Sequence, residues 1–144
     1  MKMKLRLFAV CTLVTVLSAQ DSTSRSVWDG VYSDKQAMRG EALYSEQCAR
    51  CHGAMLTGGE EAPPLVGGAF QSNWNGLSLG DLFDRIRGSM PADGPGKLRR
   101  EQVADILAHV LRVNEFPVGG SELEYRVEFL KQIRFEAVKP EKQK

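Results

Sequence analysis

The chain has 144 residues, which is enough for one domain with short extensions. Its 19 basic and 18 acidic side chains nearly balance. No basic stretch carries interleaved aromatic residues, and this argues against nucleic-acid binding.

Residues 1–19 have the pattern of a secretory signal peptide: three basic residues, an apolar run at 7–17 and small residues at 18–19. The run is shorter than the about 20 residues that a membrane-spanning helix needs. Cys11 lies inside it after Val10, where a lipoprotein signal needs a small residue. We therefore expect cleavage, a periplasmic location and no membrane span in the mature chain, with an uncleaved anchor as the alternative. Cleavage leaves 16 basic against 18 acidic side chains.

Residues 20–32 form a polar leader, and its last part, 27–32, is predicted to pack on the domain as an extended strap. Ser33 and Gln36 have the spacing of a capping box, which predicts a helix from about 34 to 48.

That helix repeats small and aromatic residues on one face. Ala37, Gly40 and Tyr44 recur at helical spacing, and a mid-helix glycine followed by an aromatic residue favours close approach of another helix at Gly40.

The segment Cys48-Ala49-Arg50-Cys51-His52 is typical of covalent haem attachment. Each thiol can form a thioether with one vinyl-derived carbon of a haem, and the next imidazole then supplies the proximal ligand. A structural zinc site needs four ligands, and only His109 is available besides these. A redox-active dithiol would follow a strand and open a helix instead. Because the haem uses both cysteines of the mature chain, no disulfide framework is expected.

A glycine- and proline-rich loop follows at 53–68. A carbonyl of Pro63 or Pro64 is our candidate acceptor for the proton on the far nitrogen of His52. The alternative is that the prolines only make a turn rigid. Next along the chain, three apolar residues are predicted to form walls of the haem pocket: Phe70, Trp74 and Leu77.

Ser78 and Asp81 predict the start of another helix, which should end at Gly88. Its expected buried residues are Leu82, Phe83 and Ile86.

Met90 opens the following glycine-rich loop and is the candidate second ligand, because a thioether sulfur suits haem iron. It lies 38 residues after His52, so the chain can cross to the other haem face. Met55 is too close to His52, and Met38 lies inside the first helix.

The clearest amphipathic helix runs from about Arg99 to Asn114. His109 lies beside its apolar stripe and is expected to be a packed or surface residue and not a ligand. The stripe consists of Val103, Ile106, Leu107, Val110 and Leu111.

Residues 118–144 contain alternating apolar residues that suit a strand, although 127–130 also suit a helical turn. So many large apolar groups are unusual for a disordered extension. We expect this tail to fold back over the domain, with docking to a partner as the alternative. Deleting residues 119–144 should lower the thermal midpoint and leave the haem spectrum nearly unchanged.

Over residues 33–117 these features together resemble a class I c-type cytochrome, similar to the cytochrome domains that accompany bacterial quinoprotein dehydrogenases. The resemblance implies an all-α small cytochrome c fold around one covalently attached haem c. By the same resemblance Cys48 and Cys51 carry the haem, and His52 and Met90 are its axial ligands.

The resemblance also implies that the first and last helices cross, with Gly40 and Tyr44 against Ile106 and Val110. His109 stands where that family usually has Tyr, and Arg99 stands where a capping Ser or Thr is common.

We therefore divide the chain into a signal peptide (1–19), a leader (20–32), a cytochrome c domain (33–117) and a C-terminal extension (118–144). The expected function is periplasmic transfer of single electrons between a dehydrogenase or other donor and a terminal acceptor. In this reading the protein is not an enzyme, its partners are redox proteins, and it acts as a monomer or as a subunit of a complex. The alternatives are a haem enzyme or gas sensor with a labile sixth ligand, and a permanent subunit of a dehydrogenase or oxidase complex.

Overall fold

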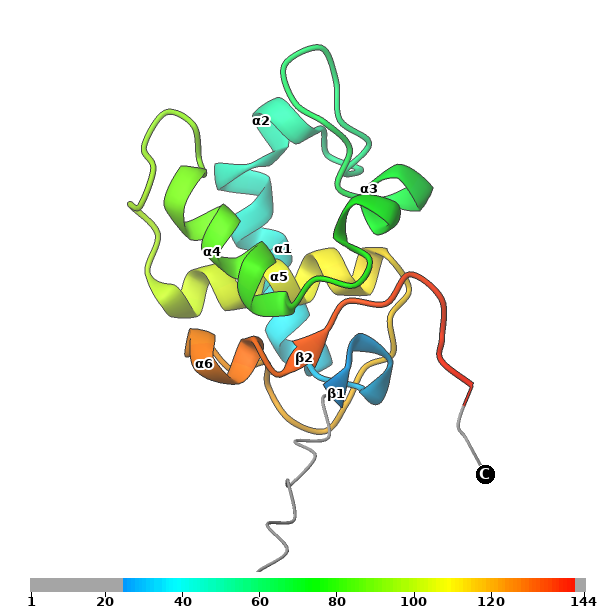
Figure 1. Cartoon of the computed structure of the whole chain (residues 1–144). Coiled ribbons are helices and arrows are strands. Elements are labelled where there is room, and N and C mark those ends of the chain that lie inside the picture. The colour runs from blue at the N-terminus through cyan, green and yellow to red at the C-terminus, as the bar shows by residue number, and fades with distance from the viewer. Residues whose placement is uncertain (1–24, 142–144) are drawn as a thin grey trace, which may run out of the picture.

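The computed structural model describes residues 25–141, so the predicted signal peptide lies outside the described residues. Within that range the chain is mostly helical, with two very short strands (Figure 1). The elements are β1 (Arg25–Ser26), the 3-10 helix η1 (Val27–Asp29), α1 (Asp34–Gln47), α2 (Ala49–His52), α3 (Gly67–Trp74), α4 (Leu79–Ser89), α5 (Arg100–Val113), α6 (Val127–Leu130) and β2 (Ile133–Arg134). The predicted all-α class is confirmed.

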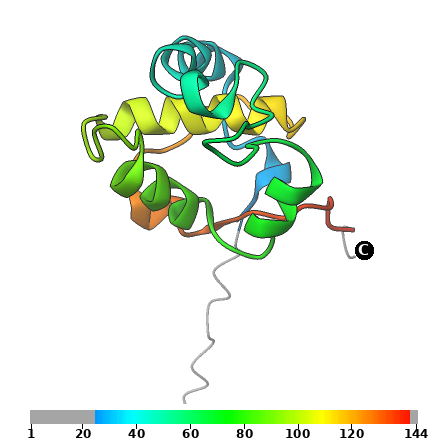
Figure 2. The same cartoon turned by 90° about the horizontal axis from the view of Figure 1, so that it is seen from above.

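Helices α1 and α5 cross in close contact, and Figure 2 shows α1 almost end-on above α5. At the crossing, Gly40 lies against the backbone carbonyl of Asp105, so no larger residue fits there. The rings of Tyr44 and His109 are 5.3 Å apart between centroids. The predicted close approach at Gly40 is therefore confirmed.

The α5 side of this crossing differs from the expectation. Asp105 and His109 contact α1, whereas Ile106 and Val110 line a cavity on a neighbouring face. The predicted contact residues of α5 are each one position too late in the sequence, which corresponds to a rotation of the contact face by about 100° around the helix axis.

Helix α1 begins where its capping signal predicts. The Ser33 hydroxyl oxygen accepts a hydrogen bond from the Gln36 backbone N–H at 3.2 Å. The predicted capping box is only half formed, because the Gln36 side chain is used elsewhere. Its amide nitrogen donates to the Leu123 carbonyl at 3.0 Å, and its amide oxygen accepts from the Leu123 N–H. The third residue of α1 therefore anchors the tail.

Helix α4 has the complete capping box that the sequence predicts. The Asp81 N–H donates to the Ser78 hydroxyl at 3.1 Å, and the Ser78 N–H donates to the Asp81 carboxylate at 2.9 Å. The Ser78 hydroxyl also donates to the Asp81 carboxylate at 2.7 Å, and this bond, together with the one from the Ser78 N–H, stabilises the ionised carboxylate and lowers the pKa of Asp81. The helix continues one residue past the predicted end at Gly88, and Met90 follows as its C-cap.

Helix α5 lacks a capping hydroxyl at Arg99. Instead, the Gln102 side-chain oxygen accepts a hydrogen bond from the Arg99 N–H at 3.0 Å. The reversed cap lets the helix begin at Arg100 without the Ser or Thr that is common in the family.

The tail folds back over the helices, as the sequence analysis favours (Figure 1). Strand β2 pairs in parallel with β1, and the segment 127–130 is a helical turn, so the strand alternative for that segment is wrong. Four tail residues are fully or nearly fully buried: Leu123, Leu130, Ile133 and Phe135.

The segment 27–32 packs on the domain, although it begins with a 3-10 turn and is not a fully extended strap. Val27 and Tyr32 are completely buried. The Tyr32 hydroxyl donates to the Phe116 carbonyl at 2.6 Å, and the Trp28 indole N–H donates to the Glu136 carbonyl at 2.8 Å. The N-terminal segment is therefore bonded to the tail through Trp28 and to the segment after α5 through Tyr32. The four-part division of the chain stays a prediction.

Candidate haem site

One cavity of about 570 Å³ lies between α1, α2, α3, α4 and α5. Cys48, Cys51, His52 and Met90 all line it, so the structure brings the four predicted site residues together. The remaining lining is largely apolar and includes Leu65, Phe70, Trp74, Leu77, Leu82, Ile86, Ile106 and Val110.

The short helix α2 places the cysteines and the histidine. Cys48 lies between α1 and α2, and its carbonyl accepts hydrogen bonds from the Cys51 N–H at 3.1 Å and the His52 N–H at 3.0 Å. Residues three and four positions apart lie on the same side of such a turn. Burial, together with the neighbouring Cys51, raises the pKa of the Cys48 thiol to about 11.

His52 is 7% exposed, and its ring is fixed by one hydrogen bond. Its Nδ1 lies 2.8 Å from the Pro63 carbonyl oxygen, so Pro63, and not Pro64, is the partner. Because a carbonyl oxygen can only accept, Nδ1 carries the proton. The other ring nitrogen, Nε2, then has a free lone pair for a metal ion.

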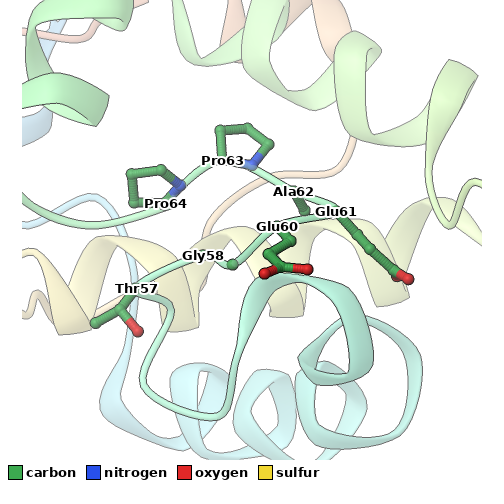
Figure 3. Close-up of a pocket in the computed structure, with 8 residues that line it drawn as sticks. Thr57, Gly58, Glu60, Glu61, Ala62, Pro63 and Pro64 are labelled. Carbon is green, nitrogen blue, oxygen red and sulfur yellow. The ribbon is translucent and has the colours of Figure 1, made fainter.

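The loop that presents Pro63 is held by its own backbone (Figure 3). The Gly58 N–H donates to the His52 carbonyl at 2.8 Å, and the Gly59 N–H donates to the Ala62 carbonyl at 2.9 Å. Gly58 has a φ of 74°, and a side chain there would meet the Pro64 backbone. In Figure 3 the proline rings and the Glu60 carboxylate lie on opposite sides of the loop.

Met90 reaches the cavity from the end of α4, whereas His52 reaches it from α2. Its N–H donates to the Ile86 carbonyl at 2.9 Å, which ties the residue to the helix. Met55 is 73% exposed and Met38 is 58% exposed, and neither lines the cavity. Among the methionines in residues 25–141, only Met90 therefore lines the cavity.

The predicted wall residues Phe70, Trp74 and Leu77 all line the cavity. Ile106 and Val110 also line the cavity, which the sequence does not predict. Their apolar periodicity indicated a buried face of α5 but not which neighbour that face contacts.

A second missed feature is an ion pair beside the cavity. Arg50, between the two cysteines, lies 2.9 Å from Asp93 in the loop after Met90. The pair is exposed, so its contribution to stability is small. It nevertheless joins the cysteine motif to the methionine loop.

His109 is buried, packs on Tyr44 and does not line the cavity, in agreement with the expected packing role. Burial and the positive charge of Arg112 lower the pKa of His109, and Glu41 opposes them. Within residues 25–141 no three His, Cys, Asp or Glu side chains are grouped so that they could hold a metal ion.

These residues fit a covalently bound haem. The cavity supplies apolar and aromatic walls, two adjacent thiols, an imidazole with a free nitrogen and a thioether sulfur from a separate segment. Each of these donors is one that haem proteins use.

Comparison with known proteins agrees with this fit. A family model described as "Cytochrome C oxidase, cbb3-type, subunit III" matches residues 35–110, which is more than half of the chain. No curated protein matches the sequence. Among solved structures, the sulfane dehydrogenase SoxCD from Paracoccus pantotrophus contains a chain with the same fold, at a TM-score of 0.50 and 20% sequence identity. The similarity covers 89% of this chain and 67% of that one. The protein therefore belongs to the family of the cbb3-type cytochrome c oxidase subunit III and is a mono-haem class I c-type cytochrome with covalently bound haem c.

Proposed function

We propose that this cytochrome is a periplasmic carrier of single electrons between a dehydrogenase or other donor and a terminal acceptor. In this proposal Cys48 and Cys51 attach the haem, and His52 and Met90 are its axial ligands. The observation that carries the proposal is the position of all four side chains around one largely apolar cavity.

The chain's own residues would tune the site in distinct ways. The Pro63 carbonyl keeps the proton on Nδ1 of His52, which leaves Nε2 for the iron. The Met90 sulfur favours a high reduction potential. The apolar walls exclude water. When bound, the haem supplies the reversible one-electron change of its iron.

The same ligand set argues for a carrier over an enzyme. If His52 and Met90 both held the iron, no position would remain for a substrate, and the haem would supply outer-sphere electron transfer only. The test is a reduced-minus-oxidised optical spectrum of the purified protein. We expect a low-spin, methionine-ligated signature, and its absence would reject the assignment of Met90.

Matched methionine variants sharpen this test. Met90→Ala should lose that signature and allow the reduced protein to bind carbon monoxide. Met55→Ala, at a position that is 73% exposed and outside the cavity, should do neither. Carbon monoxide binding by the unmodified reduced protein at neutral pH would support the labile-ligand enzyme or gas sensor instead.

A permanent place in a complex is the second candidate function. The name of the matched family refers to a subunit of an oxidase, and the tail, residues 118–144, is outside the matched range of 35–110. Co-purification from native membrane and soluble fractions distinguishes the two. A protein that stays with a dehydrogenase or oxidase through several columns is a subunit, and one that elutes alone is a carrier.

The periplasmic location depends on the N-terminal segment. Among residues 25–141 we find no helix with the length and apolar character to cross a membrane. Sequencing the N-terminus of the protein from its native host tests the expected cleavage after residue 19. An N-terminus at Met1 in the membrane fraction would support the retained anchor.

A further inference from the structure

Asn114, which directly follows α5, is polar yet only 6% exposed. Its Nδ2 donates hydrogen bonds to the carbonyls of Leu65 and Val110, both at 2.9 Å. Its Oδ1 accepts from the Gly67 N–H at 3.2 Å and, at a longer 3.5 Å, from the Gln71 side chain. The partners fix the orientation of the amide, because carbonyls only accept and a backbone N–H only donates. Every donor and acceptor of the side chain is used.

The hydrogen bond from Asn114 Nδ2 to the Leu65 carbonyl holds the loop beside His52. Leu65 lies two residues after Pro63, whose carbonyl accepts the His52 Nδ1–H at 2.8 Å. The backbone between these two points passes through Pro64, and the φ angles of both prolines are fixed. Little freedom remains between the Asn114 anchor and the Pro63 carbonyl. The Leu65 N–H also donates to the Leu56 carbonyl at 2.8 Å, so Asn114 is the side-chain anchor of a segment whose other anchors are backbone hydrogen bonds.

The hydrogen bond that Asn114 Oδ1 accepts from the Gly67 N–H caps α3. Its N-cap residue, Val66, has no side chain that can accept a hydrogen bond, so the first N–H groups of the helix need another partner. The Asn114 oxygen accepts from the Gly67 N–H and caps the helix from the end of α5. Helix α3 carries Phe70 and Trp74, which line the cavity.

We infer that Asn114 is a positioning residue for the proximal haem ligand: through Leu65 it holds the Pro63 carbonyl against the Nδ1–H of His52. The inference rests on the proposed function, in which His52 binds the iron. A firm hydrogen bond at Nδ1 makes the imidazole a stronger donor and favours the oxidised iron. Loosening this bond raises the reduction potential and opens the Nδ1–H to exchange with water.

Asn114→Asp tests the bond to the Leu65 carbonyl separately from the bond to the Gly67 N–H. An aspartate has the same shape and still accepts from the Gly67 N–H, so the cap of α3 survives. As a carboxylate it cannot donate to the Leu65 carbonyl, and it places oxygen against oxygen there. The matched control is Val103→Ala, because Val103 is fully buried on α5 but lines neither the cavity nor the Pro63 loop.

The experiment follows the His52 Nδ1 proton by NMR in the full haem-loaded protein and measures the reduction potential. We expect Asn114→Asp to exchange this proton about tenfold faster than wild type, the factor for one lost hydrogen bond. The potential is measured in the neutral Asn114→Ser, where we expect it to be higher than in wild type, because the negative charge of an aspartate would by itself lower the potential. Val103→Ala should melt at a lower temperature and change neither quantity. An exchange rate equal to wild type in Asn114→Asp, a potential equal to wild type in Asn114→Ser, or equal changes in Val103→Ala would overturn the inference.

If Asn114→Asp does not accumulate with haem, the exchange rate is measured in Asn114→Ser instead, because serine is neutral and smaller. The same outcomes decide. Failure of the proposed function is visible separately in the wild type. If its His52 resonances lack the large shifts that the haem iron imposes on a ligand, His52 is not axial and the proposed function fails. If they are present and the Asn114 variants are unchanged, only this inference fails.

Discussion

Gly40 of α1 lies directly against the backbone carbonyl of Asp105 in α5, and a methyl group at Gly40 would overlap that oxygen. Two helices can approach so closely only where one of them lacks a side chain. The contact fixes α5 relative to α1, which leads into the cysteine motif. The glycine thus helps to fix the relative positions of α1 and α5, and residues of both helices line the haem cavity.

Replacing Gly40 with alanine should reduce the free energy of unfolding by about 1–3 kcal/mol, the usual range for overpacking. The better helix propensity of alanine offsets only part of this cost. Chemical denaturation of the haem-loaded protein measures the change. The control is Gly88→Ala in α4, where no atom lies within 4 Å of the added carbon and stability should stay equal or rise slightly. Equal stability of the two variants would contradict the close crossing.

His109 should make stability depend on pH in a defined direction. Its pKa is lowered in the folded protein by burial and by Arg112, against an ordinary value of about 6.5 in the unfolded chain. Below about pH 6.5 the unfolded chain therefore binds a proton that the folded protein does not. His109 thus lowers stability as the pH falls from about 6.5 toward its folded-state pKa, and has no such effect above this range.

The measurement compares melting temperatures of wild type and His109→Phe between about pH 5 and 8, the range in which histidine titrates. Phenylalanine keeps an aromatic ring against Tyr44. We expect the melting temperature of wild type to fall relative to that of His109→Phe as the pH falls. Parallel curves would show that His109 has the same pKa in both states.

Phe135 should matter more to stability than its place near the end of the chain indicates. It is completely buried, and its ring packs edge-on against Phe70 at 5.9 Å and Phe116 at 5.2 Å. Its N–H donates to the Leu77 carbonyl at 2.8 Å. Phe135→Ala should therefore lose about 3–5 kcal/mol, as large-to-small core changes do.

The control for Phe135 is Val138→Ala, because Val138 is 80% exposed and should contribute almost nothing. Deleting residues 119–144 should lower the thermal midpoint at least as far as Phe135→Ala, with the haem spectrum nearly unchanged. A truncated protein that melts with the full chain yet loses electron transfer to a membrane extract would identify the tail as a docking element.

Covalent attachment predicts a graded result for the cysteine variants. Cys48→Ala and Cys51→Ala should each keep one thioether and remain visible as haem-stained bands after denaturing electrophoresis. The double variant should lose the band and fold poorly, because the cavity then lacks its largest apolar component. A stained band from the double variant would refute the attachment sites.

The sequence alone determined the features that depend on local spacing. The order Cys-X-X-Cys-His, the capping signals at Ser33 and Ser78 and the apolar stripe of α5 each lie within one or two helical turns. Their chemistry therefore does not depend on where the rest of the chain goes. The same holds for Met90 as a candidate, because it alone opens a glycine-rich loop at a distance from His52.

Only the tertiary structure decided which distant groups meet. Pro63, and not Pro64, bonds His52; the Gln36 side chain bonds Leu123 instead of completing a capping box; and Asn114 joins α5 to the proximal loop. A repeating apolar pattern shows which residues share a helix face but not which neighbour that face contacts. The sequence therefore predicted Ile106 at the crossing with α1, whereas the residue there is Asp105, one position earlier. Contacts between segments far apart in the chain depend on that rotation, so local sequence could not specify them.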